Sequence, residues 1–96
     1  MGRLPAVYVL LCGDGSLYTG ATVDLARRLE AHRRRRGARY TRGRLPVTLL
    51  CWWHPETYEL AKSQEARFKR LRREAKLTAL AGRELYGCPV HRESET

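Results

Sequence analysis

Cysteine is scarce in this chain of 96 residues, and its spacing does not indicate a metal site. Cys12, Cys51 and Cys88 form no CxxC pair and no cysteine–histidine pair at zinc-like spacing. Three is also an odd number, which does not favour a disulfide framework. Nothing in the sequence supplies a base matched to a nucleophilic thiol. We therefore expect reduced, buried or half-buried thiols in a reducing compartment.

Long apolar runs are missing as well. The apolar run at residues 6–12 is far too short to cross a bilayer, and the first residues do not resemble an export signal. The chain shows no internal repeats. Its length predicts one small domain, whose core can cover one sheet and a few helices. We expect a cytoplasmic protein with no membrane partner.

Acidic residues are few relative to basic ones: 10 Asp and Glu stand against 19 Lys and Arg, which gives a net charge of +9. Of those basic residues, 16 are arginines, whose planar guanidinium can donate two hydrogen bonds to one phosphate. Between Arg27 and Arg44 there are nine arginines and a single acid, Glu30. This concentration favours a polyanionic partner. A solvated basic surface is the alternative.

The N-terminal residues predict a β-hairpin. Residues 6–12 and 17–20 form its strands, and a Gly-Asp-Gly-Ser turn joins them. A two-residue turn would put Tyr8 and Tyr18 on opposite faces, whereas a three-residue loop with Gly15 left-handed places them diagonally on one face. We predict the second register. The alternative role for both tyrosines is that of half-buried sheet aromatics.

The period of apolar residues then changes to that of an amphipathic helix. Thr22 or Asp24 can cap its start, and Gly37 can end it. Arg28 and His32 are four residues apart, so both lie on the apolar stripe that faces the sheet. The alternatives for Arg28 are a side chain that extends its charged end into solvent and an ion pair with Asp24. The alternative for His32 is a purely structural hydrogen bond.

A basic loop is expected at residues 39–44 and a third strand at residues 47–53. A second helix is expected at residues 57–72, and a further helical stretch continues to residue 81. The fold class is therefore α/β, with a small three-stranded antiparallel sheet flanked by helices in the order β-β-α-β-α-α. We expect the domain to span residues 1–82 and residues 83–96 to form a frayed, mobile tail.

Glu65 lies on the apolar side of the second predicted helix. A carboxylate aimed at a core needs a cation, a metal or a helix terminus as its partner. Its hard oxygens suit Mg²⁺ or Mn²⁺. The alternative is a structural ion pair with an arginine.

Taken in order, these residues resemble the pattern of the GIY-YIG nucleases. The pattern consists of Ala6-Val7-Tyr8, Tyr18-Thr19-Gly20, Arg28, His32 and Glu65. The likeness covers about residues 6–81 and is strongest to small stand-alone bacterial members of the family. Ala6 replaces the family's Gly and Thr19 its Ile. Many members also use an Asn near the end of the domain, and this chain contains no Asn.

The resemblance implies a metal-dependent endonuclease that hydrolyses phosphodiester bonds, with DNA favoured over RNA and a place in repair or recombination. It implies catalytic roles for Tyr8, Tyr18, Arg28, His32 and Glu65. Glu65 would hold one Mg²⁺ or Mn²⁺ ion, and Arg28 would neutralise the transition state. Tyr8 would help deprotonate the attacking water, Tyr18 would position the water or the phosphate, and His32 would orient a tyrosine or relay a proton. Tyr8 needs nearby cations, such as Arg28 and the metal, to lower its pKa.

The expected nucleic-acid-binding residues are mostly the basic ones around the first helix: Arg27, Arg34, Arg35, Arg36, Arg39, Tyr40, Arg42, Arg44 and Lys69. Tyr40 could stack on a base, and the alternative is a solvated, mobile loop. A non-catalytic nucleic-acid-binding module that uses the same surface is the second functional hypothesis. A third is a basic interaction domain within a larger repair or RNA-processing assembly.

Overall fold

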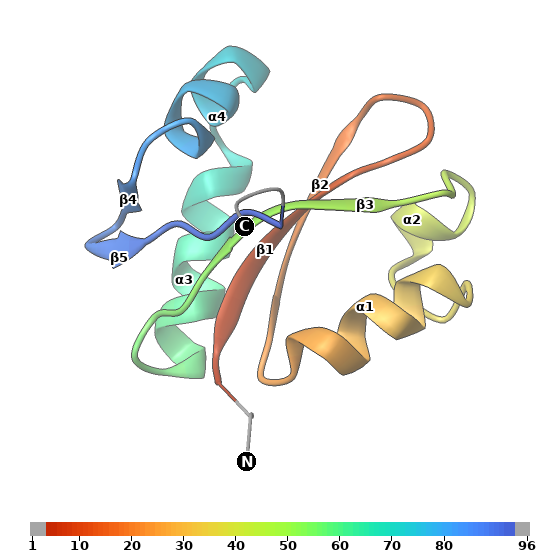
Figure 1. The fold of residues 1–96 in the computed structure, drawn as a ribbon, viewed down its shortest axis with the longest axis horizontal. Coiled ribbons are helices and arrows are strands. Elements are labelled where there is room, and N and C mark those ends of the chain that lie inside the picture. Colours follow the sequence, from red (N-terminus) through yellow and green to blue (C-terminus); the bar gives the residue numbers. More distant parts are fainter. Residues whose placement is uncertain (1–3, 94–96) are drawn as a thin grey trace.

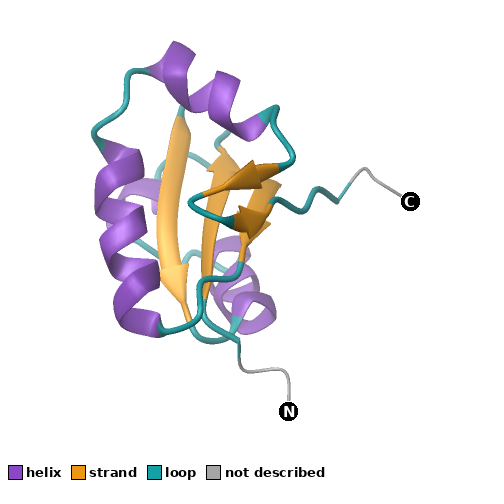
Figure 2. Cartoon of the chain, turned by 90° about the vertical axis from the view of Figure 1, so that its left-hand side faces the viewer, coloured by secondary structure: helices purple, strands orange, loops and turns teal. Residues whose placement is uncertain are grey.

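A computed structural model describes residues 4–93, which form a three-stranded antiparallel sheet with helices on both faces (Figures 1 and 2). The predicted fold class is confirmed. The elements in chain order are β1 (Ala6–Leu11), β2 (Leu17–Thr22), α1 (Leu25–Arg33), α2 (Arg39–Arg42), β3 (Thr48–Trp53), α3 (Tyr58–Lys69), α4 (Arg73–Leu80), β4 (Glu84–Leu85) and β5 (Cys88–Pro89).

The central strand is β1, and the sheet order is β2-β1-β3. Because β1 has a neighbour on each side and helices on both faces, its side chains are apolar almost throughout. Tyr8 pairs with Gly20 and Leu10 pairs with Tyr18 across the hairpin. Gly15 adopts the left-handed conformation, with φ of 86°. The three-residue loop is therefore confirmed, and Tyr8 lies diagonal to Tyr18 on one face.

Two apolar clusters sandwich the sheet. On one face Val7, Val9 and Trp53 pack against Phe68 of α3, together with residues of α4. On the other face Tyr8 and Leu10 pack with Leu29 of α1 and with residues of β3. Of the candidate site residues, Tyr8 and Tyr18 belong to the second cluster and His32 is carried by α1 on that face. Glu65 is carried by α3, which packs against the first cluster.

Local caps define the two longest helices. Asp24 caps α1 by accepting a hydrogen bond from the Arg27 amide, and Thr57 caps α3 by accepting one from the Leu60 amide. The segment expected as a basic loop after α1 contains the single-turn helix α2. No helix in the described part of the chain is both long and apolar enough to cross a membrane.

The chain after Gly82 differs from the frayed tail that the sequence predicts. Residues 84–89 form the hairpin β4–β5, and Val90 is buried in the core beside α3. His91 exchanges two backbone hydrogen bonds with Trp52 at the edge of β3, at 2.9 and 3.1 Å, and its ring stacks on the indole. Apolar contact and an open strand edge thus give this near-neutral segment regular structure. The part of the expected tail at residues 94–96 lies outside the described residues.

Candidate active site

The glycine of the second motif segment makes room for Tyr8. Tyr8 is 1% exposed, and its ring passes over Gly20 on the neighbouring strand. A Cβ atom at position 20 would lie 2.4 Å from the Tyr8 hydroxyl oxygen, far inside van der Waals contact. The Tyr18-Thr19-Gly20 segment therefore has a packing reason for its glycine, because a side chain at position 20 would collide with the Tyr8 ring.

The Tyr8 hydroxyl begins a buried chain of polar contacts. Its oxygen lies 2.9 Å from Nε2 of His32, and Nδ1 of His32 lies 2.8 Å from Oγ1 of Thr41. Thr41 Oγ1 donates its single proton to the carbonyl of Ala38, at 3.0 Å. Oγ1 must then accept from an N–H at Nδ1, which leaves Nε2 as an acceptor for the Tyr8 hydroxyl proton. The contacts therefore define a proton direction from Tyr8 to His32.

Arg28 reaches the same hydroxyl from the preceding turn of α1. Its Nε donates to the Tyr8 oxygen at 3.3 Å. Asp24 accepts from the helix amide of Arg27 and so acts as the helix cap. The expected stacking of Arg28 and His32 on one helix face is thus observed, and both side chains converge on Tyr8.

Burial shifts two pKa values at this centre. Burial raises the pKa of Tyr8 to about 12, although the hydrogen bond from Arg28 opposes the rise. Burial also lowers the pKa of His32 to about 4, and the positive charge of Arg28 lowers it further. Arg28 alone therefore does not make Tyr8 more acidic than a free phenol, because desolvation outweighs this one cation. The resting pair is a neutral phenol and a neutral imidazole.

Tyr18 is in contact with the other aromatic rings of the site. Its ring centroid lies 6.3 Å from that of Tyr8, 5.4 Å from the His32 ring and 5.9 Å from Tyr40, on which it stacks. The ammonium of Lys69 lies over the Tyr18 ring, 5.8 Å from its centroid. Tyr18 thus connects the buried Tyr8–His32 pair to the more exposed side chains of α2 and α3.

Glu65 enters from α3, in the other layer, near the open edge of β2. One of its carboxylate oxygens lies 2.7 Å from the Lys69 ammonium, and its side chain is 20% exposed. Its negative charge is among the causes that raise the pKa of Tyr8. Its cationic partner is thus a lysine, whereas the sequence suggested an arginine as the alternative to a metal. The five expected catalytic residues are assembled in one region.

A divalent cation fits the donor chemistry at Glu65. Mg²⁺ commonly takes one or two carboxylates and completes its shell with water and substrate phosphate. The described residues contain no cluster of three or more His, Cys, Asp or Glu side chains suited to a metal. Glu65 is a single accessible carboxylate that already attracts a cation. It therefore suits a magnesium site with one protein carboxylate, in which water and substrate supply the remaining ligands.

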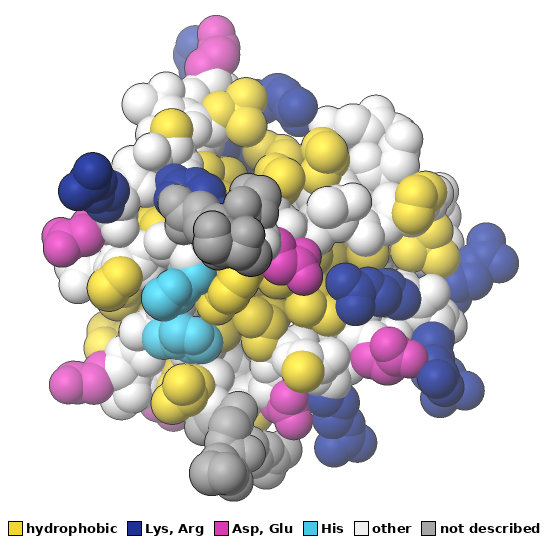
Figure 3. Space-filling model, viewed as in Figure 1, with side chains coloured by type: hydrophobic (Ala, Val, Ile, Leu, Met, Phe, Trp, Pro, Cys, Tyr) yellow, Lys and Arg dark blue, Asp and Glu magenta, His cyan; other side chains and the backbone are white. Residues whose placement is uncertain are grey.

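The expected nucleic-acid-binding arginines lie mainly on the rim of α1 and α2. Basic side chains gather over these elements in Figure 3. Those exposed to solvent are Arg27, Arg34, Arg35, Arg36, Arg39 and Arg42. Arg34 forms an ion pair with Glu30, so its charge is partly neutralised.

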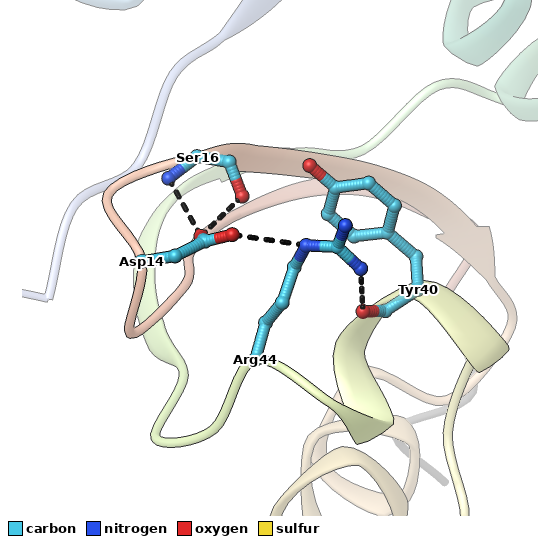
Figure 4. A network of polar contacts seen from close by, with 4 residues as sticks. All are labelled: Asp14, Ser16, Tyr40 and Arg44. Carbon is cyan, nitrogen blue, oxygen red and sulfur yellow. Dashed lines mark hydrogen bonds and ion pairs between the residues drawn. The ribbon is translucent and has the colours of Figure 1, made fainter.

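Arg44 has a bracing role in the structure. Its Nε donates to Asp14 at 3.0 Å, and another of its nitrogens donates to the Tyr40 carbonyl at 2.9 Å (Figure 4). Its guanidinium carbon lies 3.9 Å from the centroid of the Tyr40 ring. Arg44 thereby ties the hairpin turn to α2, and it occupies a face of the ring that we expected to be available to a base.

Sequence reasoning missed the roles of three residues in this region. Thr41 is fully buried and holds His32. Gly37 leaves space for the same imidazole, since a Cβ there would lie 2.2 Å from Nδ1. Lys76 of α4 lines a cleft beside Tyr18. No spacing rule links Thr41 or Lys76 to the motif residues, whereas Gly37 carries a sequence signal only as a helix stop.

The sheet order, the paired tyrosines and the helix that carries Arg28 and His32 agree with the nuclease-type fold of one catalytic-domain family. The chain matches the model of the GIY-YIG catalytic domain over residues 4–78. It belongs to the GIY-YIG family.

Its relatives are small bacterial proteins. The chain is 52% identical over 77 residues to a UPF0213 protein of Streptococcus sanguinis, which covers 80% of this chain and 88% of that relative. It is 50% identical over 72 residues to a UPF0213 protein of Bacillus velezensis, which covers 72% of this chain and 70% of the relative. Among solved structures, it is similar to the UPF0213 protein of Bacillus halodurans, determined by NMR in solution. That similarity has a TM-score of 0.54 and 41% identity and covers 86% of this chain and 85% of the other.

Proposed function

We propose that this protein is an endonuclease that hydrolyses phosphodiester bonds in nucleic acid with the aid of one divalent cation, Mg²⁺ or Mn²⁺. The single observation that carries the proposal is the Tyr8 hydroxyl. It is buried, lies 2.9 Å from an acceptor nitrogen of His32 and is contacted by Arg28 at 3.3 Å. A phenol held between a proton acceptor and a cation is suited to proton transfer.

Tyr8 and His32 act as a relay in this proposal. Tyr8 takes a proton from the attacking water while its own hydroxyl proton passes to His32 Nε2. In the resting protein, pKa values of about 12 for Tyr8 and about 4 for His32 keep that proton on the phenol. Because Arg28 already donates to the phenol in the resting protein, at 3.3 Å, the transfer needs further positive charge at the site. A divalent cation bound nearby would supply that charge. Thr41 keeps Nδ1 protonated and so keeps Nε2 free to accept.

Glu65 would hold the cation, and Lys69 would then give up its contact with that carboxylate. A divalent ion held there would supply Lewis-acid stabilisation of charge on the phosphate and on the leaving oxygen. Arg28 neutralises further charge on the transition state, and Tyr18 positions the phosphate or the water.

The exposed arginines of α1 and α2 bring the strand to the site. Contacts with phosphates do not depend on the nucleotide sequence, so we expect weak sequence specificity. We favour DNA over RNA and retain repair or recombination as the process. The cytoplasm remains the proposed compartment.

The test is cleavage of labelled single-stranded, duplex and branched DNA and of RNA, with Mg²⁺, Mn²⁺ or EDTA. We expect wild-type protein to cut with metal and not with EDTA. Glu65→Gln should abolish cutting while leaving binding equal or slightly tighter, because a negative charge is removed. The control is Glu56→Gln, which removes an exposed carboxylate before the α3 helix.

The competing hypothesis, a non-catalytic binding module, makes a different prediction. A stable wild-type protein that binds these substrates but cuts none of them with either metal would favour the module. A fall in melting temperature of Glu65→Gln without any metal-dependent activity would assign Glu65 to a structural ion pair with Lys69.

A further inference from the structure

A cleft beside Tyr18 lies next to the proposed reaction centre. Its volume is about 310 Å³. Its lining residues come from β2, α2, α3 and α4: Leu17, Tyr18, Thr19, Tyr40, Lys69 and Lys76. Leu17 packs with the cluster on the α3 face and Tyr18 with the cluster on the α1 face, so the cleft crosses the outer edge of β2. We call it the Tyr18 cleft.

The charge of the Tyr18 cleft is positive. Lys69 and Lys76 are its only charged lining residues. Lys69 is neutralised in part by Glu65, at 2.7 Å. Within residues 4–93, no ion pair engages Lys76, which is half-buried. An ammonium that has no carboxylate partner leaves positive potential in the cleft, which attracts an anion. The aromatic side chains of Tyr18 and Tyr40 form part of the same walls.

The position of the cleft indicates which anion it takes. Tyr18 belongs to both the cleft and the candidate active site, where its ring lies 5.4 Å from that of His32. Lys69 likewise contacts Glu65, the proposed cation ligand. An anion in the cleft is therefore a near neighbour of the reacting phosphate. In a polynucleotide strand, that neighbour is the next phosphodiester.

We propose that the Tyr18 cleft binds the phosphodiester adjacent to the scissile one, and that Lys76 is its dedicated cation. This subsite rests on the proposed function. It differs from the arginine rim because it engages one defined phosphate beside the cut, whereas the rim provides distributed attraction along the strand. Lys69 serves both sites and so cannot separate them experimentally.

The chain offers a matched control for Lys76. It contains three lysines, and the third, Lys62, lies on α3 with its ammonium over the exposed Tyr58 ring, 5.0 Å from its centroid. Lys62→Ala and Lys76→Ala change the net charge equally, so a difference between them reports on position. Lys76→Gln is a second variant that retains most of the side-chain stem. Thermal melts of all variants should be measured to check that each one folds.

The experiment measures equilibrium binding, by fluorescence anisotropy in EDTA, to short oligonucleotides that each carry one neutral methylphosphonate at a different position. We expect Lys76→Ala to weaken binding to the unmodified strand by about tenfold, the size of a charged hydrogen bond, and Lys62→Ala by much less. When the methylphosphonate replaces the phosphate that Lys76 contacts, the affinity of the wild-type protein should fall by a similar factor. Lys76→Ala should then cause no further loss of affinity for that oligonucleotide. Cleavage mapping with Mg²⁺ should place that position next to the cut.

Several results would overturn the proposal. One is a fall in affinity for Lys76→Ala that equals the fall for Lys62→Ala at every position. Another is a coupled phosphate remote from the cut. The experiment is repeated with deoxyribo- and ribo-oligonucleotides. A phosphate contact predicts that Lys76→Ala weakens binding to both by the same factor. A loss of affinity for only one of them would indicate recognition of the sugar instead. Because binding is measured in EDTA, coupling without cleavage would refute the nuclease and leave the anion subsite standing.

Discussion

The contact between Gly20 and Tyr8 gives the most direct test of how the fold builds the candidate site. In Gly20→Ala, the new Cβ would lie 2.4 Å from the Tyr8 oxygen, 2.5 Å from Cζ and 2.9 Å from Cε1. Favourable separations for such atoms are about 3.5 to 4.0 Å, so the ring must retreat by about 1 Å. The ring cannot simply turn outward, since Tyr8 is 1% exposed and surrounded by core.

The expected cost has two physical sources. Overpacking a well-packed core costs about 1 to 3 kcal/mol. A retreat of about 1 Å also breaks the 2.9 Å bond to His32 and leaves a buried nitrogen without its partner, at a further cost of about 1 kcal/mol or more. A total near 2 to 4 kcal/mol lowers the melting temperature by roughly 10 to 25 °C in a domain of this size. Cleavage by the folded fraction should fall by about 10²-fold, because the relay is misplaced.

The assay is a thermal melt, followed by cleavage measured well below the new midpoint. Gly43→Ala is the control, because a Cβ at position 43 meets nothing within 4 Å and its φ is −95°. That variant should stay within about 0.5 kcal/mol of wild type. A Gly20→Ala protein that melts and cuts like Gly43→Ala would refute the argument that this glycine exists to admit the phenol.

Three further predictions concern His32, Thr41 and the arginine rim. Because the folded pKa of His32 is about 4, below its ordinary value of 6.5, the unfolded chain binds a proton that the folded one refuses. The free energy of unfolding should therefore fall by about 3 kcal/mol in total as the pH drops from 6.5 to about 4. An NMR titration that finds His32 charged at pH 6 would contradict this. Thr41→Val should allow His32 to adopt the other tautomer, which should alter the ¹⁵N shifts of the ring and lower cleavage. Thr41→Ser should restore both the shifts and the cleavage. Unaltered shifts in Thr41→Val would exclude the positioning role of Thr41. Replacing Arg35, Arg36 and Arg39 by Ala should flatten the dependence of log affinity on log salt by about 0.7 to 0.9 for each phosphate that the variant no longer neutralises, and an unchanged slope would show that the rim is only solvated.

Much of the candidate site was predictable because its spacing is local. The hairpin loop fixes the relation of Tyr8 to Tyr18, since a strand repeats every two residues and one register puts both rings on one face. The helical period places Arg28 and His32 on the stripe that faces the sheet. Both expectations agree with the structure, because each depends on a single element or a single turn.

The sequence by itself determined the sheet, the helices that flank it, the basic rim and the shared face of the tyrosines, because each follows from local periodicity, turn chemistry or composition. Only the tertiary structure decided what the side chains meet. Burial made Tyr8 a weaker acid despite Arg28, and Thr41 came to hold His32. Lys69 met Glu65, Lys76 reached the Tyr18 cleft, and the expected tail folded onto β3. These outcomes depend on contacts between distant segments, and desolvation and long-range packing leave no periodic signal along the chain.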